Sequence, residues 1–457
     1  MQNILTEKQI VTKDIKDIQY GIPPLNYLSN GSKTENIQVQ VIDQTSDFND
    51  MKSEWDDLVC KAGASVFQSF SWLNSWWQSF GINRNLFIVT FINRGELVGI
   101  APFYIDIGKL FGFTVTRSLR FIGSNIPQCK PSGAFINYSI SDFHDIIVDP
   151  DYEDIIAKEL LNLLGKNFSR IDRIFLQETS ERSWVQRKLL PQLVSEEWNF
   201  KTEVDDICPL MNFNGSAKPE SLDSYIIQRK ARVRTSLRQL NRLIIDKTYY
   251  EIRMVDTHKE LEYFFPLLVE MHQSRWNDRG ASGIFINEEF IKFIFEVFKK
   301  LLDENRLWFI VVETPEKAVA FDVGILSKDK VYGYVKSFDH TCTIAKHRPG
   351  NAAFLFMIDK AIERNITEVH LLRGGEQYKY KFTQDKVVNY LVTIEGKGIS
   401  KIKRSMLKIY DIIAVQKYTL NREKLVMATQ FKQDGVIRFF PAYLKNLLER
   451  VRAKIKN

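Results

Sequence analysis

The spacing of hydrophobic residues repeats along the chain. Residues 85–105 and 306–326 each contain two apolar stretches joined by a short polar turn. This pattern predicts a strand hairpin in each half of the chain. Because self-similarity at a large offset is typical of duplicated units, we expect two copies of one α/β unit, at about 37–215 and 216–396.

Each predicted hairpin is followed by a strand, a turn, a helix and a second strand. We match the strand that starts at His144 in the first copy with residues 331–338 in the second. Regular patterning begins at Ile37, and the polar residues 1–36 show no sustained apolar period. They predict a loosely attached N-terminal arm.

Two helical patterns carry unusual side chains. Trp72, Trp76 and Phe80 recur at helical spacing after Ser71, the expected N-cap, and predict a helix packed in the core. Residues 221–246 predict one long helix with a basic face. The basic positions are Arg229, Lys230, Arg232, Arg234, Arg238 and Arg242. This face is either solvated or a binding site for the phosphates of a ligand.

Composition places the chain among folded proteins. It has 457 residues, of which 44% are hydrophobic and 26% charged, and this excludes wholesale disorder. No apolar run approaches the roughly 20 residues that span a bilayer, and the N-terminus lacks the apolar stretch of a secretory signal. The four cysteines lie far apart and predict no metal site. We therefore expect a cytoplasmic protein.

The positive charge is concentrated at the C-terminal end. Residues 397–457 hold fifteen Lys and Arg against four acids, a charge of +11, so residues 1–396 carry −4 of the total +7. Between Phe440 and Ile455, apolar residues recur at helical spacing opposite basic ones. The tail therefore predicts a basic amphipathic helix that either docks on an anionic membrane surface or packs against the body or a partner.

One turn in the second copy has the features of a phosphate-binding site. Before the helix of the first copy, residues 148–151 contain two carboxylates and no glycine. The equivalent turn of the second copy contains Lys346, Arg348, Pro349 and Gly350. Because a helix N-terminus with close backbone access favours anions, the contrast predicts one binding copy and one scaffold copy. A plain proline-glycine turn is the alternative.

Several segments resemble a known family. The order of hairpin, long strand, glycine turn, helix and strand resembles the GNAT acyltransferase core. More narrowly, the chain is similar to acetyltransferases of the cellulose-biosynthesis CelD type, which are related in their tandem layout to Fem peptidyltransferases. The resembling segments are FSWLNSWWQSFG from Phe70, LVGIAPF from Leu97, the basic helix at 229–242, MHQSRWNDRG from Met271, the RPG turn at 348–350 and LLRGGEQYKYKF from Leu371.

The resemblance implies two tandem GNAT-like domains with mixed, mostly antiparallel sheets flanked by helices, followed by the basic tail. It also implies that the second domain holds the pyrophosphate of acetyl-CoA on its glycine turn. The residues concerned are Lys346, Arg348, Pro349, Gly350, Asn351 and Ala352. The turn departs from the family pattern Gln/Arg-x-x-Gly-x-Gly/Ala, because Arg348 stands only two residues before Gly350.

A stripe of polar and aromatic side chains predicts one face of the acceptor site. His272, Arg275, Trp276 and Arg279 are spaced to lie on the same face of a helix. The neighbouring arginines disfavour protonation of the imidazole, so we expect His272 to be neutral and able to act as a base. The other three would bind substrate. A buried tryptophan with arginines that extend to solvent is the alternative.

A second set of residues follows the last strand of the second copy, where ligand crevices of α/β sheets open. Here we expect Glu376 to accept a proton from the attacking group and Tyr378 to return one to the leaving thiolate. Arg373 and Lys379 would bind substrate. A structural ion-pair cluster explains the same residues. Asp322, in an otherwise apolar strand, must be paired or functional.

The resemblance implies transfer of an acetyl group from acetyl-CoA, without a metal, to an amine or hydroxyl of a small molecule, sugar or polysaccharide precursor. Backbone N–H groups of residues 331–338 would stabilise charge on the thioester oxygen. One alternative is a Fem-like aminoacyl transferase that binds tRNA; otherwise we expect no nucleic-acid partner. Another is an inactive tandem GNAT protein that binds a partner. Docking at the inner face of the membrane would suit a lipid-linked acceptor.

Overall fold

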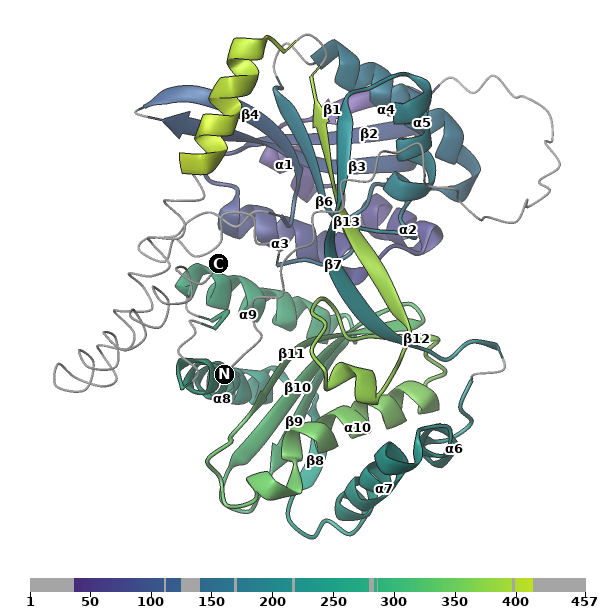
Figure 1. The fold of residues 1–457 in the computed structure, drawn as a ribbon, viewed down its shortest axis with the longest axis vertical. Coiled ribbons are helices and arrows are strands. Elements are labelled where there is room, and N and C mark those ends of the chain that lie inside the picture. The colour runs from purple at the N-terminus through teal and green to yellow at the C-terminus, as the bar shows by residue number, and fades with distance from the viewer. Residues whose placement is uncertain are drawn as a thin grey trace, which may run out of the picture.

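The computed structural model describes residues 37–110, 112–124, 140–167, 171–215, 218–278, 283–285, 287–396 and 399–413. They form one 13-stranded mixed sheet with helices packed against it (Figure 1). The predicted N-terminal arm and the tail beyond residue 413 lie outside the described residues. Within these ranges, no helix is long and apolar enough to cross a membrane.

The first half contributes seven strands and five α-helices to the described fold. Its strands are β1 (Gln38–Ile42), β2 (Asn85–Asn93), β3 (Glu96–Leu110), β4 (Phe113–Phe121), β5 (Ile147–Val148), β6 (Arg173–Ser180) and β7 (Phe200–Asn212). Its helices are α1 (Thr45–Asn49), α2 (Lys52–Ala62), α3 (Phe70–Phe80), α4 (Glu153–Asn167) and α5 (Leu190–Ser195). The predicted hairpin at 85–105 is the pair β2 and β3.

The second half repeats this order. Its helices are α6 (Leu222–Ile227), α7 (Ala231–Ile245), α8 (His258–Asn277), α9 (Glu288–Asp303) and α10 (Pro349–Glu363). Its strands are β8 (Glu251–Val255), β9 (Leu307–Glu313), β10 (Ala318–Ser327), β11 (Lys330–Phe338), β12 (Glu368–His370) and β13 (Lys386–Glu395). A further helix covers residues 401–413. The mixed α/β fold with two copies of one unit is confirmed.

The two halves exchange their last strands. The strand order is β1-β2-β3-β4-β6-β13-β7-β12-β11-β10-β9-β8, and β5 pairs with β3 off this path. β13, which ends the second half, lies between β6 and β7 of the first half and is antiparallel to both. β7 then continues into the second half, where residues 210–212 pair with β12 (Figure 1). The predicted domain boundary near residue 215 stays a prediction.

The parallel strand pairs show which segments correspond between the halves. β4 runs parallel to β6, as β11 runs parallel to β12, and α4 and α10 precede the second strand of each pair. The counterpart of residues 331–338 is therefore β4. Our match to the segment that starts at His144 is wrong, because that segment forms only the two-residue β5 beside β3.

Two helix predictions need correction. The N-cap of α3 is Ser69, whose backbone is extended, and Ser71 lies inside the helix. The single helix over 221–246 is two helices, because the chain turns between Ile227 and Ala231. At this turn Arg229 points inward and donates to the carbonyl oxygen of Phe382, so one member of the predicted basic face has a structural role.

The core joins the two halves. α3 is buried along most of its length, and its polar side chains Ser71, Asn74 and Ser75 are buried together with its aromatic ones, so the helix is enclosed by protein. Trp72 packs edge-on against Phe293 of α9, with ring centroids 5.6 Å apart, and Phe67 packs against Tyr332 of β11. The predicted packing of the α3 aromatics in the core is confirmed, and that core lies between the halves.

Candidate functional site

The sheet of the second half opens between β11 and β12. These strands pair only through residues 330–332 and 368–370, although β11 continues to Phe338. On its other side, the ladder with β10 contains a β-bulge that leaves Tyr334 as the extra residue. Bulges of this kind bend a strand and are frequent next to active sites. Residues 333–338 of β11 are therefore not paired with β12, and this edge of the strand faces the opening.

α10 begins beside this opening. Arg348 precedes it with a φ of 59°, and its guanidinium donates to Oγ of Ser236 on α7 at 2.5 Å and to O of the same residue at 3.2 Å. A Cβ added at Gly350 would lie 3.2 Å from the Phe338 side chain, so glycine lets β11 and the helix start approach closely. Pro349 occupies the first helical position, which suits its fixed φ.

The predicted cofactor-binding residues therefore divide by role in the structure. Arg348 fastens the turn to α7, and Ala352 is buried under it. Lys346 and Asn351 are exposed at the start of α10. An α-helix leaves the N–H groups of its first turn without acceptors inside the helix, and its positive dipole end favours anions. Pro349 has no N–H group, and those of Asn351 and Ala352 donate to the carbonyl oxygen of Arg348. The turn can accordingly offer the backbone N–H of Gly350 and the ammonium of Lys346 to a phosphate.

A buried ion pair crosses β10 and β11 next to the opening. Asp322 lies opposite Lys336 in the ladder, and Lys336 Nζ is 3.0 Å from Asp322 Oδ2. Asp322 is fully buried, and this burial raises its pKa to about 6 against the opposing effect of Lys336. Burial also lowers the pKa of Lys336. The ammonium lies 3.2 Å from the centroid of the Phe354 ring on α10, a cation–π contact.

The loop after β12 brings Glu376 and Tyr378 to the same region. Tyr378 is 40% exposed, and the burial of the rest of its side chain raises its pKa, with the charges of Glu376 and Asp322 adding to the effect. The charge of Glu376 also acts on Lys336. Of the four predicted catalytic residues, Asp322 thus contacts Lys336, the charge of Glu376 acts on Lys336, and the charges of both carboxylates act on Tyr378.

Two of the predicted substrate-binding cations have partners within the protein. Lys379 is 4% exposed, and its ammonium donates to the carbonyl oxygens of residues 372–374 and pairs with Glu376 at 2.9 Å. It therefore holds the loop in shape. Arg275 stacks over the ring of Phe338, with its guanidinium carbon 4.3 Å from the centroid. The positive charge of Arg275 thereby reaches the opening and opposes the rise in the pKa of Tyr378.

His272 lies deeper in α8. Its Nε2 accepts a hydrogen bond from Trp276 Nε1 at 3.0 Å, and its ring packs edge-on against Phe285. Burial lowers the pKa of His272 to about 4, and the charge of Arg275 contributes in the same direction. The imidazole is therefore neutral at pH 7, chiefly because of burial and less because of the neighbouring arginine. Trp276 is 38% exposed, and Arg279 lies outside the described residues.

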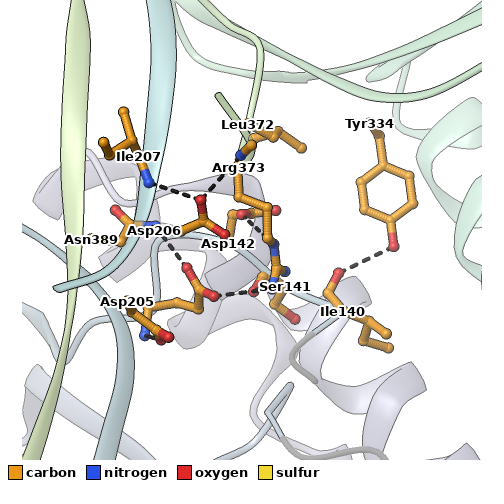
Figure 2. Close-up of polar contacts among 12 residues, drawn as sticks. Ile140, Ser141, Asp142, Asp205, Asp206, Ile207, Tyr334, Leu372, Arg373 and Asn389 are labelled. Atoms are coloured by element: carbon orange, nitrogen blue, oxygen red, sulfur yellow. Dashed lines mark hydrogen bonds and ion pairs between the residues drawn. The ribbon is translucent and has the colours of Figure 1, made fainter. Parts of the chain in front are cut away.

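Arg373 is directed away from the opening, into the junction of the two halves. Figure 2 shows its guanidinium next to Ser141 and Asp142, where Nε donates to Asp142 Oδ1 at 3.0 Å. Its Nη1 donates to Glu178 Oε1 at 3.0 Å, and Asn389 of β13 donates to the other oxygen of Glu178 at 2.9 Å. Arg373 therefore ties the loop after β12 to the segment at residues 141–142 and to β6, and through Glu178 to β13.

Several carboxyl groups lie around the single guanidinium of Arg373 at this junction. Glu178 has a φ of 55°, and its backbone N–H donates to Asp205. Burial raises the pKa of Glu178 to about 8; Arg373 opposes this rise and Asp142 adds to it. Asp206 accepts from the N–H of Gly374. Within the described ranges, no group of three or more His, Cys, Asp or Glu side chains is arranged to hold a metal ion.

In the first half, the turn before α4 has different side chains. Asp149 stands before α4, is 1% exposed, and pairs with Lys61 at 2.6 Å. Its other oxygen caps the following turn by accepting from the N–H of Asp151. Since a carboxylate occupies the place that a phosphate would need, the geometry agrees with a scaffold role for this copy.

Sequence reasoning missed Lys336 and the junction partners Asp142, Glu178 and Asn389. The signal for Lys336 was present, because a lysine in the strand after Asp322 offers the partner that a buried carboxylate requires. The junction partners come from segments more than 190 residues from Arg373 or from the exchanged strand. No local pattern in the sequence connects them.

Comparison with known proteins agrees with this geometry. The family model described as acetyltransferase (GNAT) domain matches residues 229–380, which include the opening, the glycine turn and the loop after β12. The solved structure of FemX superposes with a TM-score of 0.52 at 9% sequence identity, covering 78% of this chain and 96% of FemX. The fold is thus that of two GNAT-like domains.

Other solved structures are similar at a lower level. A conserved protein of unknown function from Bacteroides thetaiotaomicron gives a TM-score of 0.45 at 12% identity, covering 78% of this chain and all of that one. A tandem GNAT protein from the clavulanic acid biosynthesis pathway gives 0.40 at 8% identity, covering 80% and 100%. Among curated proteins, no sequence matches this chain. The narrower resemblance to the CelD type stays a prediction.

Proposed function

We propose that this protein is an acetyl-CoA-dependent acetyltransferase whose active site is the opening between β11 and β12. The observation that carries the proposal is the convergence of three features there: the bulged, unpaired edge of β11, the glycine start of α10, and the loop with Glu376 and Tyr378. The GNAT family model covers the same residues.

The residues at the start of α10 fit the diphosphate of such a donor. The N–H group of Gly350, in the first turn, and the exposed Lys346 would bind the phosphate oxygens, whereas the N–H of Asn351 already donates to the carbonyl oxygen of Arg348. Gly350 leaves no Cβ in this space. The edge of β11 after the bulge would offer N–H groups to the thioester oxygen, where negative charge develops during the reaction.

The side chains at the opening suit direct attack. The acceptor nitrogen or oxygen bonds to the thioester carbonyl carbon, the carbon–sulfur bond breaks, and the thiolate takes a proton. Glu376 would receive the proton of the acceptor, and Tyr378, whose raised pKa keeps it protonated at neutral pH, would supply one to the thiolate. His272 is neutral, but it is buried in α8 and its Nε2 accepts from Trp276. We therefore assign His272 to the side of the opening where the acceptor would bind.

For the acceptor we propose only a chemical class, which is an amine or hydroxyl of a small molecule, sugar or polysaccharide precursor. The second candidate function is a Fem-like aminoacyl transferase, which the likeness to the fold of FemX favours. In that case the remaining arginines of α7 would contact tRNA. A protein that binds a partner without catalysis would keep the fold but bind no acyl donor.

Titration of the purified chain with acetyl-CoA tests the proposal. Gly350→Glu places a side chain against Phe338 and a negative charge at the phosphate position, so we expect it to weaken binding by about a hundredfold or more. Gly165→Glu is the matched control, because Gly165 is exposed on α4 and an added Cβ there meets only Trp198, at 3.9 Å.

Calorimetry on the three proteins separates the outcomes. Micromolar binding by the wild type and by Gly165→Glu, with loss in Gly350→Glu, supports both the function and the site. Equal binding by all three would show that the donor lies elsewhere. Absence of binding by the wild type, together with binding of an aminoacyl-tRNA, would favour the second candidate.

A further inference from the structure

The helix at residues 401–413 is fastened to the first half by its polar side. Arg173 of β6 binds Asp411 with two hydrogen bonds of 2.6 and 2.8 Å. Lys403 Nζ donates to the carbonyl oxygen of Val115 at 2.8 Å, and Arg404 pairs with Glu395 of β13 at 3.0 Å. The orientation of this helix relative to the sheet is therefore set by charged contacts along its length.

The opposite side of the same helix is apolar and exposed. Ile402 is 76% exposed, Met406 47%, Ile409 54% and Ile412 58%. Their spacing of four, three and three residues places them in one stripe along the helix. The side of the helix that faces the body carries its own apolar residue, Leu407, which is 3% exposed. The outward stripe is therefore a second apolar face, and contiguous exposed apolar surface marks an interaction site.

The helix that carries the stripe packs against the edge of the first half. The helix packs on the β3–β4 hairpin, where a Cβ at Gly108 would meet Tyr410 Oη at 2.5 Å. Figure 1 shows the helix alongside β4 at the edge of the molecule. β4 starts with Phe113, which is 78% exposed.

This part of the chain carries an excess of positive charge. Lys401 and Lys408 are exposed on the helix. The 44 residues that follow, 414–457, hold ten Lys and Arg against three acids, a charge of +7. An occupant must therefore accept both isoleucine side chains and an excess of cations. In a second copy of the chain, the same segment would carry the same charge of +7, so the two segments would repel each other. An anionic lipid surface satisfies both requirements.

We propose that the stripe Ile402, Met406, Ile409 and Ile412 inserts into an anionic membrane surface and docks the folded protein there. Each isoleucine that enters the interface leaves water, and the exposed Lys401 and Lys408 of the same helix contact lipid phosphates. Because the helix is fastened to β4, β6 and β13, docking would orient the whole body toward the bilayer. The inference does not depend on the proposed acyltransferase activity.

Co-sedimentation of the full chain with vesicles tests the proposal. We expect binding to vesicles of phosphatidylglycerol and phosphatidylcholine, and much weaker binding to phosphatidylcholine alone. Ile402→Glu should lower the partition coefficient about tenfold or more, because it removes buried apolar area and adds a negative charge. Ile82→Glu is the matched control, since Ile82 is also 76% exposed but lies between α3 and β2.

Several results would overturn the proposal. One is failure of the wild-type chain to sediment with the anionic vesicles; another is equal sedimentation of wild type and Ile402→Glu. If Ile402→Glu instead dissociated a dimer in sedimentation velocity, or lowered the thermal midpoint while vesicle binding was unchanged, a second copy or the chain's own tail would be the occupant.

Discussion

At the scale of single residues, the pair of Asp322 and Lys336 has the strongest physical consequence. Both charges are removed from water between β10 and β11, and only their 3.0 Å contact and the Phe354 ring offset the cost. Buried pairs of this kind contribute little net stability, but removal of one partner leaves an uncompensated charge. Sequence reasoning could say that Asp322 must be paired or functional, and it is paired.

Lys336→Met should destabilise the protein by about 3–5 kcal/mol, because the carboxyl of Asp322 would remain buried without a cation. The double variant Asp322→Leu/Lys336→Met should recover most of this loss, since both polar groups are then absent. Urea unfolding of the wild type, the single variant and the double variant measures the effect. A single variant within about 0.5 kcal/mol of wild type would contradict it.

Activity of the double variant then separates two roles for this pair. If the pair only supports the sheet, the recovered protein keeps the turnover of acetyl-CoA that we propose for the wild type. If Lys336 also stabilises charge at the opening, turnover falls while stability is restored. Lys336 was not predicted, because a lysine that alternates with apolar residues in a strand usually points to solvent.

At the scale of elements, the hydrophobic pattern was sufficient to place most strands and helices but not their neighbours. The hairpins at 85–105 and 306–326 and the helix before each closing strand follow from local periodicity. The position of β13 between β6 and β7 does not, because pairing over about 200 residues leaves no periodic signal. For the same reason the direction of Arg373 toward the first half could not be predicted.

Ile394→Asp should disrupt the part of the sheet that belongs to the first half rather than the part that belongs to the second half. Ile394 of β13 is fully buried in the core beneath α4 and α5, and it pairs with Ile174 of β6. A buried carboxylate there lacks a partner. Hydrogen exchange should show faster exchange in β4 and β6.

Thr393→Asp is the control for this substitution. Because side chains alternate along a strand, the side chain of Thr393 lies on the other face of β13 from Ile394, and it is half-buried. It adds the same charge one residue away and should leave exchange in β4 and β6 close to wild type. Protection in β6 that survives Ile394→Asp would argue against the strand exchange.

At the scale of the whole molecule, the halves share β7, exchange β13 and enclose α3 between them. In each half, the strands of the sheet are completed by a strand from the other half of the chain. Two related domains predicted from sequence would be expected to unfold separately. The structure instead predicts one cooperative unit, because loss of either half exposes the strands and the aromatic core of the other.

Leu355→Ala tests this cooperativity. Leu355 of α10 is fully buried in the second half, and its truncation should cost about 2–5 kcal/mol. Urea unfolding should remain a single transition that is coincident by circular dichroism and tryptophan fluorescence, at a lower midpoint. A biphasic curve in which only one phase moves would show that the halves unfold independently.

The exchanged strand also governs how the protein can be made. On the ribosome, β6 and β7 emerge long before residues 386–395, so the first sheet keeps a gap between them until nearly the whole body has been synthesised. During that interval two strand edges are available to other nascent chains. A premature stop anywhere before residue 386 would therefore damage the N-terminal half as well, and a cell should handle such fragments as misfolded protein rather than as a free first domain.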